Sequence, residues 1–184
     1  MSGRCPGCAP ADATVPIELP SPINQLHSFT MPTVFDRLSA LLAEHQVEFE
    51  VLEHEPVFTS VEAARVRGTS LSSGAKALIC KTDQHFVMFV LPADRRLASK
   101  EVRKQMGARS LRFAKGEEVL ELTGLKPGSI PPFGSLFELK TYCDQRLHDE
   151  TVINFNAGDH ARSISMTYAE FQRVEQPEIG LFAE

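Results

Sequence analysis

The sequence predicts a single α+β domain in which helices are interleaved with antiparallel strands of a mixed sheet. Apolar residues recur every three or four positions in some segments and alternate in others, so both helices and strands are expected. Residues 75–81 and 85–91 are separated by three polar residues, which is the spacing of a β-hairpin. The sequence lacks the regular strand-helix-strand repeat of a parallel α/β fold, which favours the α+β class.

Composition limits the size and the setting of this domain. The chain has 184 residues, 42% of them hydrophobic, which suits one core of ordinary size. Its net charge of -5 argues against a non-specific nucleic-acid coat, so any RNA contact must come from a local basic patch. No secretory signal, membrane-spanning run or disulfide framework is found, and we expect a cytoplasmic protein without a membrane partner.

Residues 1–32 are expected to form a flexible N-terminal arm, and residues 33–184 the folded domain. The arm contains six prolines and little apolar periodicity. It also carries Cys5 and Cys8 as a CxxC pair, a spacing that occurs in zinc sites and redox motifs. One pair is only half a zinc site, and we interpret it as an incidental feature of the arm.

The first half of the domain contains two predicted helices and three predicted strands. Apolar residues at helical spacing begin at Val34 and predict an amphipathic helix. Residues 47–52 alternate apolar with acidic side chains and predict a half-buried strand. Thr59 or Ser60 is expected to cap a short helix over residues 62–66, which is followed by the hairpin.

The second half is expected to complete the sheet. Its predicted helices cover residues 99–106, 117–122 and 168–174, and its predicted strands cover residues 110–113, 136–142, 151–156 and 163–166.

Lys76 is the first candidate functional residue. Strand alternation places it on the same face as Leu78 and Cys80. A buried ammonium group requires a carbonyl, a carboxylate or a ligand phosphate as its partner. The alternative is a lysine on an edge strand that extends to water, and spacing alone does not choose between the two.

Two loops are the other candidates. The segment from Gly128 to Gly134 places two prolines between two glycines, which can present backbone groups as a rigid wall. The segment from Asn156 to His160 delivers a histidine that could carry a proton or bind a ribose hydroxyl. Taken singly, a plain connection and a surface histidine are the commoner interpretations of these loops.

Four stretches in order carry a resemblance to a known family. They are His54-Glu-Pro-Val-Phe-Thr59, Ala75-Lys-Ala-Leu78, Gly128-Ser-Ile-Pro-Pro-Phe-Gly134 and Asn156-Ala-Gly-Asp-His160. Residues 33–174 resemble the YbaK and prolyl-tRNA-synthetase-associated editing domains, some of which are free-standing proteins that hydrolyse mischarged tRNA. The resemblance implies a partly barrel-like mixed sheet flanked by helices, with a pocket for the aminoacyl group on the terminal adenosine.

The resemblance also implies roles for individual residues. Lys76 would hold the pocket's backbone or the terminal phosphate, and need not act as a base. Gly128 and Pro132 match the family's GxxxP loop, which would position the ester carbonyl and the attacking water, and His160 would close the far side. The expected substrate-binding residues are His54, Phe58, Thr59, Ser129, Ile130, Phe133, Gly134, Asn156 and Gly158.

The predicted function is hydrolysis of a mischarged aminoacyl-tRNA in trans, with tRNA(Pro) or a related tRNA carrying a small wrong amino acid. Alanine, cysteine, serine and threonine remain open as that amino acid. The sequence has no GxSxG or HExxH motif, so we expect no metal and no cofactor. Mischarged tRNA is the expected partner, an aminoacyl-tRNA synthetase is a second candidate, and DNA is not expected. The alternative function is a non-catalytic module with the same fold that binds tRNA or a synthetase.

A basic segment supplies the predicted tRNA contact. Lys100, Arg103 and Lys104 share one face of the helix expected over residues 99–106. Phosphate binding there is compatible with an acidic protein. A merely solvated helix face is the alternative.

Overall fold

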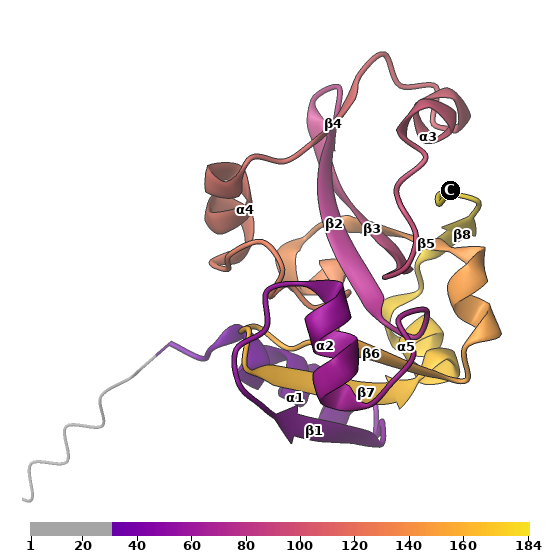
Figure 1. The fold of residues 1–184 in the computed structure, drawn as a ribbon. Coiled ribbons are helices and arrows are strands. Elements are labelled where there is room, and N and C mark those ends of the chain that lie inside the picture. The colour runs from indigo at the N-terminus through magenta and orange to yellow at the C-terminus, as the bar shows by residue number, and fades with distance from the viewer. Residues whose placement is uncertain (1–30) are drawn as a thin grey trace, which may run out of the picture. The chain divides into compact units, whose positions relative to one another are not determined.

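The computed structural model describes residues 31–184 (Figure 1). The expected N-terminal arm, apart from residues 31 and 32, and the CxxC pair lie outside this range and stay predictions. Within residues 31–184, the structure has no helix with the length and apolar character needed to cross a membrane.

The α+β class is confirmed, but within residues 31–184 the strands form two sheets and not the one sheet that was expected. The smaller sheet is antiparallel and has the order β1-β7-β6, with β1 at Phe49–Glu53, β6 at Val152–Asn156 and β7 at Arg162–Thr167. The larger sheet has the order β4-β2-β3-β5-β8, with β2 at Ala75–Thr82, β3 at His85–Pro92, β4 at Leu111–Phe113, β5 at Lys140–Asp144 and β8 at Glu178–Gly180. Strand β2 is antiparallel to β3 and β4, whereas β5 is parallel to both β3 and β8, so the larger sheet is mixed.

The two sheets meet at the beginning of β2. Gly74 and Asn154 form an isolated parallel bridge, and the Asn154 backbone N–H donates to the Ser73 carbonyl at 2.9 Å. The Asn154 side-chain amide also donates to the Ser73 hydroxyl, at 3.1 Å. The expected partly barrel-like sheet is therefore two sheets joined at one point, and the described strands do not close into a barrel.

Within residues 31–184, five α-helices and two short 3-10 helices accompany the strands. The α-helices are α1 at Val34–Glu44, α2 at Ser60–Arg67, α3 at Ser99–Gln105, α4 at Gly116–Thr123 and α5 at Tyr168–Glu175, and the 3-10 helices are η1 at Gly134–Phe137 and η2 at Gln145–Asp149. Thr33 and Thr59 begin α1 and α2 with reciprocal capping boxes, in which Asp36 and Glu62 bond back to the cap backbone. Figure 1 shows α2 in front of β6 and β7, below the long hairpin of β2 and β3.

Side chains on the two faces of β2 enter different apolar clusters. Ala75 and Ile79 belong to the larger cluster, which also holds the mutually packed rings of Phe133, Phe155 and Phe171. Cys80 belongs to the smaller cluster on the other face. Strand β2 is thus packed on both sides, and its position relative to both cores is fixed.

Two predictions about strands are wrong in part. The strand expected over residues 136–142 begins only at Lys140, because η1 occupies its start and Glu138 has a left-handed backbone (φ +57°) that ends η1. The alternation expected to bury Val51 also fails, since that side chain is 44% exposed. The reason is that β1 is an edge strand, paired only with β7.

The C-terminal residues are fastened to the larger sheet by a buried carboxylate. Asp144 accepts hydrogen bonds from the backbone N–H groups of Phe182 and Ala183, both at 2.7 Å. Glu184 then exchanges two backbone hydrogen bonds with Arg96, at 2.8 and 3.1 Å. The chain end therefore supports the segment of residues 93–98 that leads into α3.

Candidate active site

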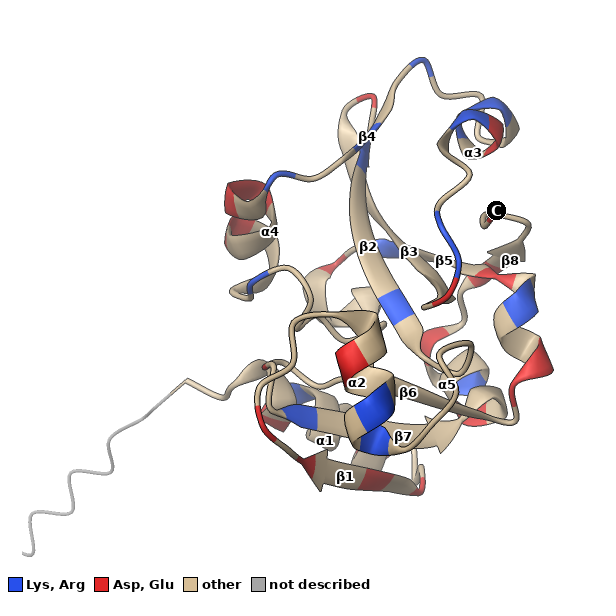
Figure 2. Cartoon of the chain, viewed as in Figure 1, with Lys and Arg blue, Asp and Glu red and all other residues tan. Residues whose placement is uncertain are grey.

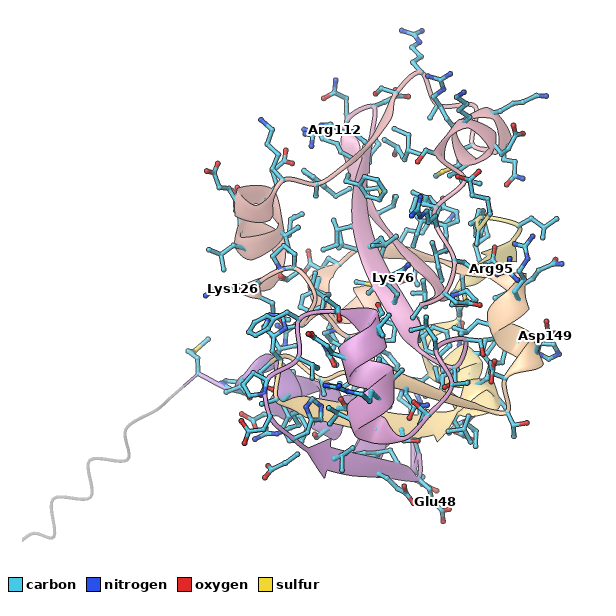
Figure 3. All side chains as sticks on the ribbon, viewed as in Figure 1. Glu48, Lys76, Arg95, Arg112, Lys126 and Asp149 are labelled. Carbon is cyan, nitrogen blue, oxygen red and sulfur yellow. The ribbon has the colours of Figure 1, made fainter. Side chains whose placement is uncertain are left out.

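A cavity of about 320 Å³ lies between α2, the start of β2, the turn at Gly128 and the end of β6. This volume is at the small end of the range for ligand pockets. Six of the residues singled out in the sequence line it: Phe58, Thr59, Lys76, Gly128, Ile130 and Asn156. Figure 3 shows Lys76 on β2 above α2, with Lys126 marking the turn that leads into Gly128. Each of the four stretches that carry the resemblance therefore contributes at least one residue to the lining of this cavity.

Lys76 is half-buried at this cavity and is bonded to the backbone that follows the neighbouring strand β3. Its Nζ donates to the Arg95 carbonyl at 2.5 Å and approaches the Ala93 carbonyl at 3.4 Å. Burial lowers the pKa of Lys76, and the nearby Asp94 carboxylate opposes this shift in part. The ammonium therefore holds the backbone of residues 93–95 in place, and its role in a reaction stays a prediction.

The turn at Gly128 is fixed by contacts with the β6–β7 connection. Gly128 has φ +93°, and a Cβ there would lie 3.2 Å from Cε1 of His160. Its carbonyl accepts a hydrogen bond of 2.6 Å from the Asn156 side-chain amide, and the Ser129 carbonyl accepts one of 3.0 Å from Gly158. A glycine at position 128 is thus required by both torsion and space.

His160 lies behind the cavity wall. Its Nδ1 is 3.1 Å from the Val57 carbonyl, and its ring packs against Phe58 with centroids 4.8 Å apart. Because a carbonyl only accepts, Nδ1 carries the hydrogen in this contact. His160 therefore supports two residues that line the cavity, Phe58 and Gly128, and does not line it itself.

Several expected substrate-binding residues also lie outside the cavity lining. Phe133 is fully buried in the larger cluster, and the Gly134 N–H donates to the Thr141 hydroxyl at 3.2 Å. The Ser129 hydroxyl donates to the Lys126 carbonyl, and a Cβ at Gly158 would lie 3.2 Å from the backbone nitrogen of Phe35. Pro132, which was expected to be catalytic as part of the GxxxP loop, is also buried and outside the cavity lining. These residues can shape the cavity only through the loops that they hold.

Arg67, which the sequence reasoning missed, joins His54 to the turn at Gly128. Its Nε donates to the Ser163 hydroxyl at 2.9 Å, and its Nη2 donates to Oδ1 of Asn156. Ser163 is also 2.7 Å from Nε2 of His54, and Asn156 holds the Gly128 carbonyl. His54 thus lies at the far end of a polar network that reaches the cavity through Arg67 and Asn156. A signal was present in the sequence, since Ser60, Ala63, Ala64 and Arg67 share one helix face and all four line the cavity.

Two cysteines of residues 31–184 lie outside the cavity lining. Burial raises the pKa of Cys80 and Cys143 to about 12 each, so neither thiol is a ready nucleophile. In the same residues, no group of three or more histidine, cysteine or acidic side chains is placed to hold a metal ion.

The predicted tRNA-binding residues lie on an exposed helix beyond the cavity. Lys100, Arg103 and Lys104 are exposed on α3, and among the described side chains they join no ion pair. Figure 2 shows basic residues both on α3 and along the loop that leads to it from β3. Arg112, by contrast, is paired with Glu118 at 2.6 Å.

The chain is similar in sequence to known proteins. Residues 54–174 match the family described as "Aminoacyl-tRNA editing domain". The chain is similar to the Multifunctional Ser/Thr-tRNA deacylase ProXp-y of Escherichia coli (strain K12), with 37% identity over 152 residues that cover 79% of this chain and 90% of that protein. It is also similar to the Prolyl-tRNA editing protein ProX of Acetoanaerobium sticklandii, with 22% identity over 142 residues, 73% of this chain and 86% of that protein.

A solved structure shares the fold. This crystal structure is provisionally described as a trans-editing enzyme for prolyl tRNA synthetase, and it superposes with a TM-score of 0.73. The sequences are 24% identical, and the match covers 84% of this chain and 99% of the other.

Proposed function

The chain belongs to the aminoacyl-tRNA editing domain family, and from that premise we propose that its cavity removes serine or threonine from a mischarged tRNA. The chain has the general activity of its family: it is an aminoacyl-tRNA deacylase, which hydrolyses the ester in trans. The observation that supports the site is that Lys76 and Gly128, from distant parts of the sequence, line one cavity. The non-catalytic alternative is set aside, because the 37% identical relative is named as a deacylase.

The proposed reaction relies on orientation. An aminoacyl ester is already activated, so holding the ester, a water molecule and a stabilising donor in place can supply most of the acceleration. The water oxygen bonds to the ester carbonyl carbon, and the bond from that carbon to the ribose oxygen breaks. The proton that the attacking water loses is transferred to the ribose oxygen. The fixed backbone at Gly128 would position the carbonyl, and Lys76 would keep the backbone of residues 93–95, which follows β3, in place.

The proposed amino acid has a hydroxyl group, and Thr59 is the candidate to recognise it. Thr59 lines the cavity, and its hydroxyl accepts from the Glu62 backbone N–H at 3.2 Å and bonds to the Glu62 carboxylate. Its second lone pair remains to accept a hydrogen bond from a ligand hydroxyl. Alanines at positions 63 and 64 leave room beside it. A site that hydrogen-bonds a substrate hydroxyl rejects an analogue without that group strongly, so alanine should be a poor substrate.

A panel of mischarged tRNAs tests this proposal. Seryl-, threonyl-, alanyl- and cysteinyl-tRNA, each on tRNA(Pro) and on a second acceptor, would be incubated with the purified protein and the remaining ester measured. We expect the seryl and threonyl esters to be hydrolysed fastest. Equal rates for all four amino acids would refute the assignment of the amino acid, and independence from the acceptor would refute a preference for tRNA(Pro).

The same assay addresses the metal. We propose hydrolysis without a metal ion, so a chelator should leave the rate unchanged. Loss of activity on chelation, with recovery on adding one metal, would contradict that part. A synthetase partner and a cytoplasmic location stay predictions.

A further inference from the structure

The described lining of the cavity contains two cations and no acidic residue. These cations are Lys76 and Arg67. The Lys76 ammonium is bonded to backbone carbonyls and lies near the Asp94 carboxylate. Arg67 is bonded only to neutral oxygens, those of Ser163 and Asn156, and within residues 31–184 it joins no ion pair. The cavity therefore has a positive charge that no described side chain neutralises.

This charge is held in a fixed orientation. Burial lowers the pKa of Arg67 to about 10, so the guanidinium remains charged at neutral pH. Its Nε and Nη2 are engaged by the polar network, which fixes the plane of the group, and within residues 31–184 Nη1 has no hydrogen-bond partner. A half-buried cation is costly without an anionic partner, and a guanidinium matches phosphate oxygens in geometry as well as in charge.

We propose that Arg67 binds the phosphodiester that links the terminal adenosine of the tRNA to the preceding nucleotide. The proposal rests on the proposed function and extends it to the recognition of the nucleotide. Of the groups near the ester, this phosphate alone carries a permanent negative charge, whereas the ester is neutral and the α-amino group is cationic. Asn156 bonds to both Arg67 and the Gly128 carbonyl, so one side chain would set the position of the phosphate relative to the ester.

The test compares two small substrates that differ only in this phosphate. They are 3′-O-threonyl-adenosine and the same ester with a 5′-phosphate. For the parent protein we expect kcat/KM to be at least roughly ten-fold higher with the phosphate, since a hydrogen bond to a charged group is worth about 1.5–3 kcal/mol. Arg67→Gln should abolish this preference, and Arg67→Lys should retain part of it.

Arg65→Gln is the matched control. Arg65 is exposed on the same helix, so the charge change is identical, and it should leave the preference intact. The ratio of the two rates does not depend on how much of a variant is folded, so partial unfolding cannot imitate the result. With threonyl-tRNA, Arg67→Gln should also reduce the slope of log kcat/KM against log salt by about 0.7, the value for one phosphate contact on a single strand.

The outcomes separate this proposal from the function on which it rests. If Arg67→Gln slows both small substrates by the same factor, or if the parent shows no preference, Arg67 does not bind the phosphate. The deacylase assignment would survive either result. If the parent hydrolyses neither small substrate nor any charged tRNA, the proposed function itself fails, and this proposal fails with it.

Discussion

Replacing Lys76 with alanine tests whether hydrolysis requires the backbone of residues 93–95 to be held in position. The change removes the 2.5 Å bond to the Arg95 carbonyl and the longer contact with Ala93. One hydrogen bond to a charged group is worth about 1.5–3 kcal/mol, and at about 2 kcal/mol its full loss in the transition state lowers kcat/KM roughly 30-fold. Both carbonyls can bond to water instead, so we expect the melting temperature to fall by only about 2–4 °C, the shift that about 1 kcal/mol produces in a domain of this size.

The assay is single-turnover hydrolysis of threonyl-tRNA at neutral pH, with spontaneous hydrolysis subtracted. Lys81→Ala is the matched control, because Lys81 lies on the same strand but outside the cavity, with its ammonium 5.0 Å from the centre of the Phe86 ring. Equal hydrolysis by Lys76→Ala and the parent would remove Lys76 from the mechanism. An equal loss in Lys81→Ala would mean that the effect is not specific to the cavity.

A pH profile adds an independent readout for Lys76. Burial lowers the pKa of this group below the usual 10.5, so its charge is lost at a lower pH than that of an exposed lysine. Hydrolysis by the parent should therefore decline at alkaline pH before ordinary lysines titrate. The variant should lack that decline, and an identical profile in both proteins would contradict the assigned role.

Three further predictions concern the basic helix, a packed glycine and a buried carboxyl. Reversing the charges of Arg103 and Lys104 should weaken tRNA binding at low salt, with the difference shrinking as salt is added; unchanged affinity at moderate salt would exclude this helix as a contact. Gly134→Ala should destabilise the fold by about 1–3 kcal/mol in chemical denaturation, because its Cβ would lie 2.3 Å from a hydroxyl oxygen and 2.6 Å from a backbone carbonyl oxygen. Gly116→Ala, where a Cβ meets nothing within 4 Å, should be neutral or stabilising by up to about 1 kcal/mol, and equal losses would refute the steric argument. Burial raises the pKa of Glu175 above 4.5, so its contribution to stability is greatest below 4.5 and is lost as pH rises through the raised value. The melting temperature of the parent relative to Glu175→Gln should therefore rise as pH falls from 7 toward 4.5, and a constant difference would contradict the shift.

The elements that sequence predicted well are those with local causes. Thr33 and Thr59 each bond to the backbone three residues later, so the starts of α1 and α2 are fixed by neighbouring residues. The hairpin of β2 and β3 follows from its short connection. The parallel pairing of β5 with β8 was not predicted, because η2, β6, β7 and α5 lie between them in the sequence and no local signal marks the pairing.

The candidate site was predictable to a similar extent. Alternation was enough to single out Lys76, but whether its ammonium meets water or a carbonyl depends on the segment of residues 93–95, which arrives from beyond β3. Phe133, which was expected to bind substrate, packs against Phe155 and Phe171, and the sequence could not show this contact because those residues come from distant parts of the chain. Arg67 was missed for a related reason, since its partners Ser163 and Asn156 lie on the smaller sheet, far from α2 in the sequence.

The anchoring of the chain end by Asp144 has a practical consequence for work on this protein. Glu184 is hydrogen-bonded to Arg96, one residue from the carbonyl that receives the Lys76 ammonium. An affinity tag fused directly after residue 184 would crowd the backbone hydrogen bonds between Glu184 and Arg96, and their loss would loosen the segment that Lys76 holds. Expression plasmids should therefore place the tag ahead of residue 1, or insert a flexible spacer before a C-terminal one.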